Sequence, residues 1–218
     1  MSLAIFDLDN TLIAGDSDHS WGEFLVAQSI VDRQLYKEMN DKFYADYESG
    51  NLDIFAYLEF SVEPLTRLPM KDLQQLHKLF MKDVVKPMIL NQATDLINRH
   101  RKAGDRLLVI TSTNRFIVEP ICLSLGIDEI IATDLEIVNG QYSGNIVGTP
   151  TFQEGKVARF NQWLEENSES NSESYFYSDS INDLPLLMEV AHPVAVDPDS
   201  ALRKEAESRQ WKIISLRD

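Results

Sequence analysis

Short apolar runs alternate with amphipathic stretches along most of this 218-residue chain. Apolar runs that predict strands lie at 3–7, 106–110, 130–133, 175–178, 191–196 and 212–215. Helical spacing of apolar residues fills 89–102, 115–125, 154–167 and 200–208, and a further helix is expected from about Leu184. Asn139-Gly140 predicts a hairpin turn. This alternation predicts an α/β fold, a Rossmann-like and mostly parallel sheet with helices on both faces.

The stretch from Trp21 to about Val85 departs from the alternation, because its pattern is helical throughout. We expect Ser17 or Asp18 to cap the first of its helices and Pro64 to end a later one. A second helix should bury a stripe at spacing four, formed by Leu35, Met39, Phe43 and Tyr47. So long a helical stretch predicts an inserted helical-bundle cap at 16–86, with 1–15 and 87–218 forming the core domain.

Polar residues that carry chemistry follow the predicted strands. Asp7 and Asp9 follow the first strand, Thr111 follows the second and Asp179 follows a later one. Alternation along an extended chain puts Asp7 and Asp9 on the same side. Because the carboxyl ends of parallel strands meet at one edge of the sheet, we expect these side chains to converge there. Two close carboxylates repel, unless a cation lies between them or one is protonated.

Charge and cysteine content limit the classes of partner. The net charge is −15, from 35 acidic and 20 basic residues, so nucleic acid and anionic membranes are not expected partners. The single cysteine, Cys122, allows no disulfide within the chain and predicts a cytoplasmic protein. We expect no membrane span and no signal peptide, and either a monomer or a homodimer. The four histidines have no ligand spacing and are expected on the surface or in packing: His19, His77, His100 and His192.

Asp7-x-Asp9-x-Thr11 after an apolar strand resembles the first motif of the haloacid dehalogenase superfamily, most of whose members are magnesium-dependent phosphatases. Thr111, Lys156 and the run Asp179-Ser180-Ile181-Asn182-Asp183 match the remaining motifs in order. The resemblance therefore covers nearly the whole chain. It implies a phosphatase that acts on a small phosphate ester, with Mg²⁺ as its cofactor.

The resemblance also implies roles for individual residues. Asp7 would attack phosphorus and Asp9 would act as acid and base, while Thr111 and Lys156 would hold the phosphoryl oxygens. Mg²⁺ would be bound by Asp7, the backbone carbonyl of Asp9 and Asp179. Asp183 would orient either Lys156 or a water on the metal. Ser112 and Asn182 are expected at the substrate.

The chain is similar to the subgroup of phosphoserine phosphatases, and more closely to a branch that contains histidinol-phosphate phosphatases. Asp16-Ser17-Asp18 and the run Thr111–Phe116 carry this likeness. In the subgroup, a carboxylate nine residues after the nucleophile pairs with the substrate amine, and Asp16 has that position.

The arginine that binds the substrate carboxylate in this subgroup is replaced by Ser61, and Arg67 lies further along the chain. An amine-bearing ester without a carboxylate, such as histidinol phosphate, is thus a better candidate than phosphoserine. Two alternatives remain at this point. One is phosphoryl transfer to an acceptor other than water, and the other is a non-catalytic regulator that binds phosphate or metal.

Overall fold

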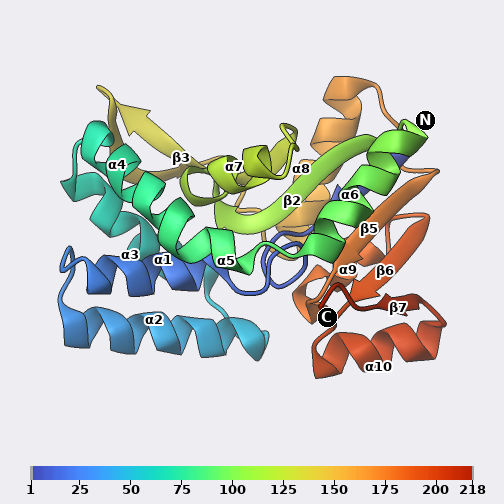
Figure 1. Ribbon diagram of the computed structural model, residues 1–218, viewed down its shortest axis with the longest axis horizontal. Helices are drawn as coiled ribbons and strands as arrows, with labels where there is room; N and C mark the ends of the chain where they lie inside the picture. The colour runs from blue at the N-terminus through green and yellow to red at the C-terminus, as the bar shows by residue number, and fades with distance from the viewer. Residues whose placement is uncertain (1, 218) are drawn as a thin grey trace.

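Seven strands form one sheet in the computed structural model, which describes residues 2–217 (Figure 1). The strands are β1 (Leu3–Phe6), β2 (Arg106–Asn114), β3 (Ile130–Val138), β4 (Gln141–Val147), β5 (Ser174–Ser178), β6 (His192–Val196) and β7 (Lys212–Ile214). Their order across the sheet is β4-β3-β2-β1-β5-β6-β7, and neighbours are parallel except β3 and β4. The antiparallel pair is the predicted hairpin, which turns at Asn139-Gly140.

The helices are α1 (Ser17–Ala27), α2 (Arg33–Glu48), α3 (Ile54–Arg67), α4 (Met70–Phe80), α5 (Lys86–Met88), α6 (Asn91–Ala103), α7 (Arg115–Ser124), α8 (Glu154–Asn167), α9 (Leu184–Leu187) and α10 (Ser200–Arg209). A π-helical turn, η1 (Met81–Val85), joins α4 to α5, and a 3₁₀ turn, η2 (Ile181–Asp183), precedes α9. No helix among the described residues has the length and apolar content that crossing a membrane would need.

The alternation of side chains in β1 separates two apolar layers. Ala4 and Phe6 belong to one buried cluster, which also contains residues of α6 and α7. Leu3 and Ile5 belong to the other, which contains residues of α8, α9 and α10. Helices therefore cover both faces of a mostly parallel sheet, which confirms the predicted fold class.

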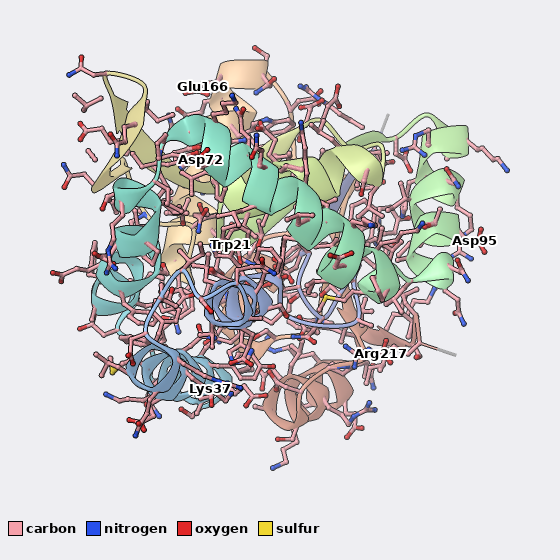
Figure 2. The ribbon with its side chains drawn as sticks, turned by 60° about the vertical axis from the view of Figure 1, so that its left-hand side comes forward. Trp21, Lys37, Asp72, Asp95, Glu166 and Arg217 are labelled. Atoms are coloured by element: carbon pink, nitrogen blue, oxygen red, sulfur yellow. The ribbon has the colours of Figure 1, made fainter. Side chains whose placement is uncertain are left out.

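Helices α1 to α6 come between β1 and β2 in the chain, and Figure 1 shows α1 to α4 to one side of strands β5 to β7. Trp21 of α1 lies near the middle of this arrangement, while Lys37 lies on the outer side of α2 (Figure 2). The Trp21 ring centroid is 5.1 Å from that of Phe80 in α4 and 5.4 Å from that of Phe116 in α7. The inserted helices are thus packed on the helices of the sheet through aromatic contacts.

Three local predictions were wrong. Pro64 does not end a helix but lies inside α3. Its burial beside Leu65 offsets the free-energy cost of the backbone hydrogen bond that proline cannot donate. Asp16, rather than Ser17 or Asp18, caps α1 by accepting a hydrogen bond from the His19 N–H at 2.8 Å. Leu35 is 65% exposed, because α2 turns Tyr36 and Asn40 toward the interior instead, while Phe43 of the predicted stripe is buried as expected.

Candidate active site

Asp7 follows directly after β1, and its carboxylate contacts the ammonium group of Lys156. The backbone N–H of Asp7 donates to the carbonyl of Tyr177 at 2.9 Å, which continues the pairing of β1 with β5 beyond the strand end. Lys156 lies in the first turn of α8 and is fully buried. Its Nζ donates to Asp7 Oδ1 at 2.8 Å. Residues 149 positions apart in the chain are therefore joined in a buried ion pair.

A second carboxylate, Asp183 of η2, holds the same ammonium group. Asp183 Oδ1 lies 2.6 Å from Lys156 Nζ, and Asp183 Oδ2 accepts a hydrogen bond from the Ser178 hydroxyl at 2.7 Å. Ser178 is the last residue of β5, so the sheet itself fixes the orientation of Asp183. Lys156 is consequently clamped between two acids, and Asp183 positions it against Asp7.

Asp179 follows β5 and is tied to the loop after β1 by Thr11. The Thr11 hydroxyl lies 3.1 Å from Asp179 Oδ1 and 3.1 Å from the backbone nitrogen of Asp179. The hydroxyl can donate to the carboxylate and accept from the N–H. Thr11 therefore does more than support its own turn, since it fixes the position of an acid 168 residues away.

Asp9 is half-buried, and both of its carboxylate oxygens accept hydrogen bonds. Oδ1 accepts from the Ser17 N–H at 2.6 Å, and Oδ2 accepts from the Thr113 hydroxyl at 2.9 Å. Burial is the main cause that raises the pKa of Asp9 to about 7, and the nearby Asp16 adds to it. These bonds fix the carboxyl group, and its raised pKa is suited to proton transfer near neutral pH.

A cavity opens at this edge of the sheet. The acids that line it are Asp7, Asp9, Asp16 and Asp18. Strand β2 contributes Thr111, Ser112 and Thr113, and the inserted helices and their connecting loop contribute His19, Asn40, Phe43, Tyr44, Tyr47, Leu52, Ile54 and Tyr57. Helices α2 and α3 thus form the part of the wall that faces the acids.

The remaining residues named from the sequence lie at or near this cavity. Ser112 lines it, and the Ser112 carbonyl accepts a hydrogen bond from the Thr133 hydroxyl at 3.0 Å. The Thr111 hydroxyl accepts from the Thr113 N–H at 3.3 Å. Asn182 is buried and bridges two segments: its side-chain N–H donates to the Tyr47 carbonyl at 3.0 Å, and its oxygen accepts from the Gln153 side chain at 3.2 Å. Asn182 therefore links η2 to α2.

The charge balance at the end of β1 fits a divalent cation. Burial is the largest cause that raises the pKa of Asp7, to about 7, while Lys156 opposes the rise. Burial also holds the pKa of Asp179 well above its usual value, and Asp7 and Asp183 reinforce this effect. Asp7 and Asp183 thus share a single ammonium group, and Asp179 adds a third interacting acid without a basic partner of its own in these contacts. Hard carboxylate oxygens with excess negative charge are the ligands that Mg²⁺ prefers, so Asp7, Asp179 and Asp183 suit it chemically.

A different group of side chains brings three ligand atoms within 4.8 Å of one another: His19, Glu23 and Asp41. The sequence interpretation of His19 as a surface or packing residue overlooked this group. Lys37 already supplies a positive charge there, with Nζ 3.0 Å from Glu23 Oε1 and 3.1 Å from Asp41 Oδ2. The protein itself therefore offsets part of the negative charge of this group.

Sequence reasoning missed Thr113 as a partner of Asp9, and it missed the contact between Asp18 and Tyr57. Thr113 could have been found, because it lies two residues after Thr111 and thus on the same side of an extended strand. No sequence signal points to the hydrogen bond that the Tyr57 hydroxyl donates to Asp18, because it joins α3 to α1.

The fold and the polar edge of the sheet define a hydrolase of the haloacid dehalogenase type. Residues 4–188 match the sequence pattern of the haloacid dehalogenase-like hydrolase family, and the chain belongs to this family. It is 48% identical over 220 residues to the histidinol-phosphatase of Neisseria meningitidis serogroup C (strain 8013), with 99% of each chain covered.

Two solved structures are similar to this one. A protein of unknown function from Bordetella pertussis Tohama I superimposes with a TM-score of 0.93 at 41% identity, and 99% of each chain is covered. A substrate-bound complex of phosphoserine phosphatase has a TM-score of 0.72 at 18% identity, covering 97% of this chain and 91% of that one. The second likeness shows a shared fold.

Proposed function

We propose that this protein is a Mg²⁺-dependent phosphatase that hydrolyses a small, amine-bearing phosphate monoester, with histidinol phosphate as the first candidate. The observation that carries the proposal is the clamp at the end of β1, where Lys156 lies between Asp7 and Asp183. This clamp orients the Asp7 carboxylate at a cavity that Asp9 also lines. A nucleophile and a separate acid–base group are what two-step hydrolysis of a phosphate ester needs.

In the first step, a carboxylate oxygen of Asp7 attacks phosphorus and forms a P–O bond. The bond between phosphorus and the ester oxygen breaks, and Asp9 donates a proton to the departing alkoxide. The pKa of Asp9, raised to about 7, keeps a substantial share of this group protonated near neutral pH. Thr113 and the Ser17 N–H hold the Asp9 carboxyl group in place for this transfer.

In the second step, Asp9 takes a proton from water, and the water oxygen attacks phosphorus. The bond between phosphorus and Asp7 breaks, which releases inorganic phosphate and restores the Asp7 carboxylate. Thr111, Ser112 and Lys156 are proposed to hold the phosphoryl oxygens through both steps. Mg²⁺, held by Asp7, the Asp9 carbonyl and Asp179 with Asp183 nearby, would offset the negative charge that accumulates in this site.

The composition of the cavity wall favours an amine over a carboxylate on the substrate. Among the described residues that line the cavity, none is lysine or arginine. Ser61 is buried in α3 outside this lining, and Arg67 pairs with Glu63 on the exposed side of the same helix. Phosphoserine would therefore bring a carboxylate to a lining that offers no lysine or arginine among its described residues. The name of the Neisseria relative points to histidinol phosphate, which has no carboxylate.

We further propose the division into a core of 1–15 with 87–218 and a cap of 16–86. Ile13 and Ile89 form an antiparallel bridge, so the two chain crossings between these parts lie side by side. Helices α4, η1 and α5 follow one another without a break up to Met88. The chain therefore passes from the cap back to the core at the end of a helix and not in a loop. The cap would supply the wall from α2 and α3 that selects the substrate.

The test is phosphate release from histidinol phosphate, with and without MgCl₂, by the wild type and Asp7→Asn. We expect metal-dependent turnover that falls by at least about 1,000-fold in Asp7→Asn, because the nucleophile is lost. Asp95→Asn is the matched control, since Asp95 is an exposed acid of α6 (Figure 2). Turnover that survives the loss of the Asp7 carboxylate would contradict the mechanism. A higher kcat/KM for phosphoserine than for histidinol phosphate would contradict the substrate.

A further inference from the structure

Two acids at the start of α1 line the cavity, and their carboxylates have different partners. Asp16 is the N-cap of α1, and its Oδ1 accepts a hydrogen bond from the His19 N–H at 2.8 Å. Part of its hydrogen-bonding capacity is therefore used to begin the helix. Asp18 lies in the first turn of the same helix and accepts a hydrogen bond from the Tyr57 hydroxyl. Asp18 is thus oriented by a side chain of α3 and has oxygen lone pairs left for a ligand.

The cavity that Asp18 lines has an aromatic wall. Phe43, Tyr44 and Tyr47 come from α2 and Tyr57 from α3, and all four line the cavity. The Phe43 and Tyr57 ring centroids are 5.4 Å apart at an interplanar angle of 65°. Aromatic rings beside a carboxylate attract a cationic group and pack against a flat heterocycle.

Among the described residues of this lining, no lysine or arginine offsets the acids. His19 is the basic residue of the lining, but its Nε2 lies 3.0 Å from Asp41 and its ring packs on Tyr44. Burial raises the pKa of the Asp18 carboxyl to about 7, and the charged groups that interact with it are other acids, Asp9 and Asp16. A positively charged ligand group would relieve both the burial and the repulsion.

We propose that Asp18, oriented by Tyr57, is a specificity-determining residue that binds a second cationic group on the leaving alcohol. This inference rests on the proposed phosphatase function and names the substrate class more closely. Asp16 would take one basic group, and Asp18 with the aromatic wall would take the other. Phosphate esters of small alcohols with two basic nitrogen groups, one of them a flat heterocycle, are then preferred over esters with one or none.

The experiment compares three esters on the wild type, Asp18→Asn, Tyr57→Phe and Asp18→Glu. Histidinol phosphate has two basic groups, O-phosphoethanolamine has one, and p-nitrophenyl phosphate has none. We expect Asp18→Asn to lower kcat/KM for histidinol phosphate about 10- to 100-fold more than for p-nitrophenyl phosphate, chiefly through KM. The ratio of kcat/KM for histidinol phosphate to kcat/KM for p-nitrophenyl phosphate measures this preference. Tyr57→Phe keeps the ring and should lower this ratio less than Asp18→Asn does. Asp18→Glu keeps the charge, so its ratio should lie between those of Asp18→Asn and the wild type.

Equal losses on all three esters, or no loss on any of them, would overturn the assignment of Asp18. Asp72→Asn is the matched control, because Asp72 is an exposed acid in the first turn of α4 (Figure 2) and the charge change is the same. If the wild type releases phosphate from none of the esters, the phosphatase function fails and this inference fails with it. If it releases phosphate but Asp18→Asn keeps the wild-type ratio, the inference alone fails.

Discussion

Lys156 Nζ lies 2.8 Å from Asp7 Oδ1 and is fully buried, so the proposed nucleophile is paired with a cation from α8. This pair joins the first strand of the sheet to a helix that begins beyond the β3–β4 hairpin. Desolvation lowers the pKa of Lys156, but Asp183 and Asp7 outweigh it, so the pKa stays above its usual value and the ammonium form persists. The position of the nucleophile therefore depends on a charge that neutral pH does not remove.

Replacing Lys156 with methionine should reduce both activity and stability. The variant keeps a long side chain but leaves Asp7 and Asp183 as buried acids without their shared cation. Removing one partner of a buried ion pair typically costs about 3–5 kcal/mol. We expect a kcat lowered by at least about 100-fold, since the phosphoryl group also loses a charged donor, together with a lower Tm.

Lys37→Met is the control for this substitution. Lys37 forms ion pairs on the exposed side of α2, with Glu23 and Asp41, and exposed pairs contribute little to stability (Figure 2). Thermal melts and initial rates on the two variants measure the difference. Similar Tm values for both, or unchanged turnover by Lys156→Met, would show that the clamp is not needed.

Thr113→Val should shift the pH profile of turnover. The Thr113 hydroxyl donates to Asp9 Oδ2 at 2.9 Å, and this bond favours the ionised carboxylate and so lowers its pKa. Valine cannot donate, so the pKa of Asp9 rises in the variant and the proton is lost at a higher pH. The limb of the kcat profile that reports Asp9 as an acid should move to higher pH. The maximal kcat should fall about tenfold or more, because the Asp9 carboxyl group loses the hydrogen bond that orients it.

Thr94→Val is the comparison, because Thr94 is exposed on α6 and donates to the Leu90 carbonyl. Rates with p-nitrophenyl phosphate between pH 5 and pH 9 would measure the profile of each variant. An unshifted profile in Thr113→Val would mean that Asp9 does not act as the acid.

Much of the candidate site could be predicted from the sequence, because its residues lie at the carboxyl ends of parallel strands. Asp7 and Asp179 each follow a strand that pairs in parallel with its neighbour, and Thr111 lies in β2, just beyond the predicted strand end at Ile110. Their convergence therefore follows from strand direction. The same reasoning could not predict the contact between Asp18 and Tyr57. That contact depends on how α3 lies against α1, which is decided by packing between helices and not by the period of either.

Two of the wrong predictions have a common physical cause, which is that burial overrides a local rule. Pro64 was expected to end a helix because proline cannot donate, yet its helix continues to Arg67 with Pro64 and Leu65 buried. Leu35 was expected inside from spacing alone, but Tyr36 and Asn40 occupy the interior side of α2. Periodicity gives the existence of a helix, whereas its rotation depends on the partners it meets.

The protein without metal should lose stability as the pH rises through neutrality. Burial raises the pKa values of Asp9, Asp16 and Asp18 to about 7, from a usual value near 3.8. An acid whose pKa is raised in the folded state binds its proton more tightly there. Its contribution to stability is therefore complete below about pH 4 and is lost as the pH rises through about 7.

In EDTA, we thus expect a lower Tm at pH 8 than at pH 5. Added Mg²⁺ should raise the Tm more at pH 8, where the site acids are ionised, than at pH 5. Asp41, Asp134 and Glu136 have lowered pKa values, so they titrate below this window and leave the trend unchanged. Differential scanning fluorimetry at the two pH values measures both effects. A Tm that rises from pH 5 to pH 8 in EDTA would contradict the origin assigned to these pKa values.

Gly155→Ala should disturb the site without removing any polar group from it. A Cβ atom at Gly155 would lie 2.0 Å from the Pro150 carbonyl oxygen and 3.3 Å from the Pro150 carbonyl carbon. Since backbone atoms cannot rotate away as a flexible side chain does, the start of α8 must move, and Lys156 is the next residue. A shift of about 1 Å in a positioning group can cost roughly 100-fold in rate, so we expect kcat to fall by at least about tenfold, with a lower Tm. Glu154→Ala is the matched change in the same helical turn, because Glu154 is exposed and its truncation leaves Lys156 in place. If Gly155→Ala and Glu154→Ala have equal rates, the placement of Lys156 by the first turn of α8 does not limit turnover.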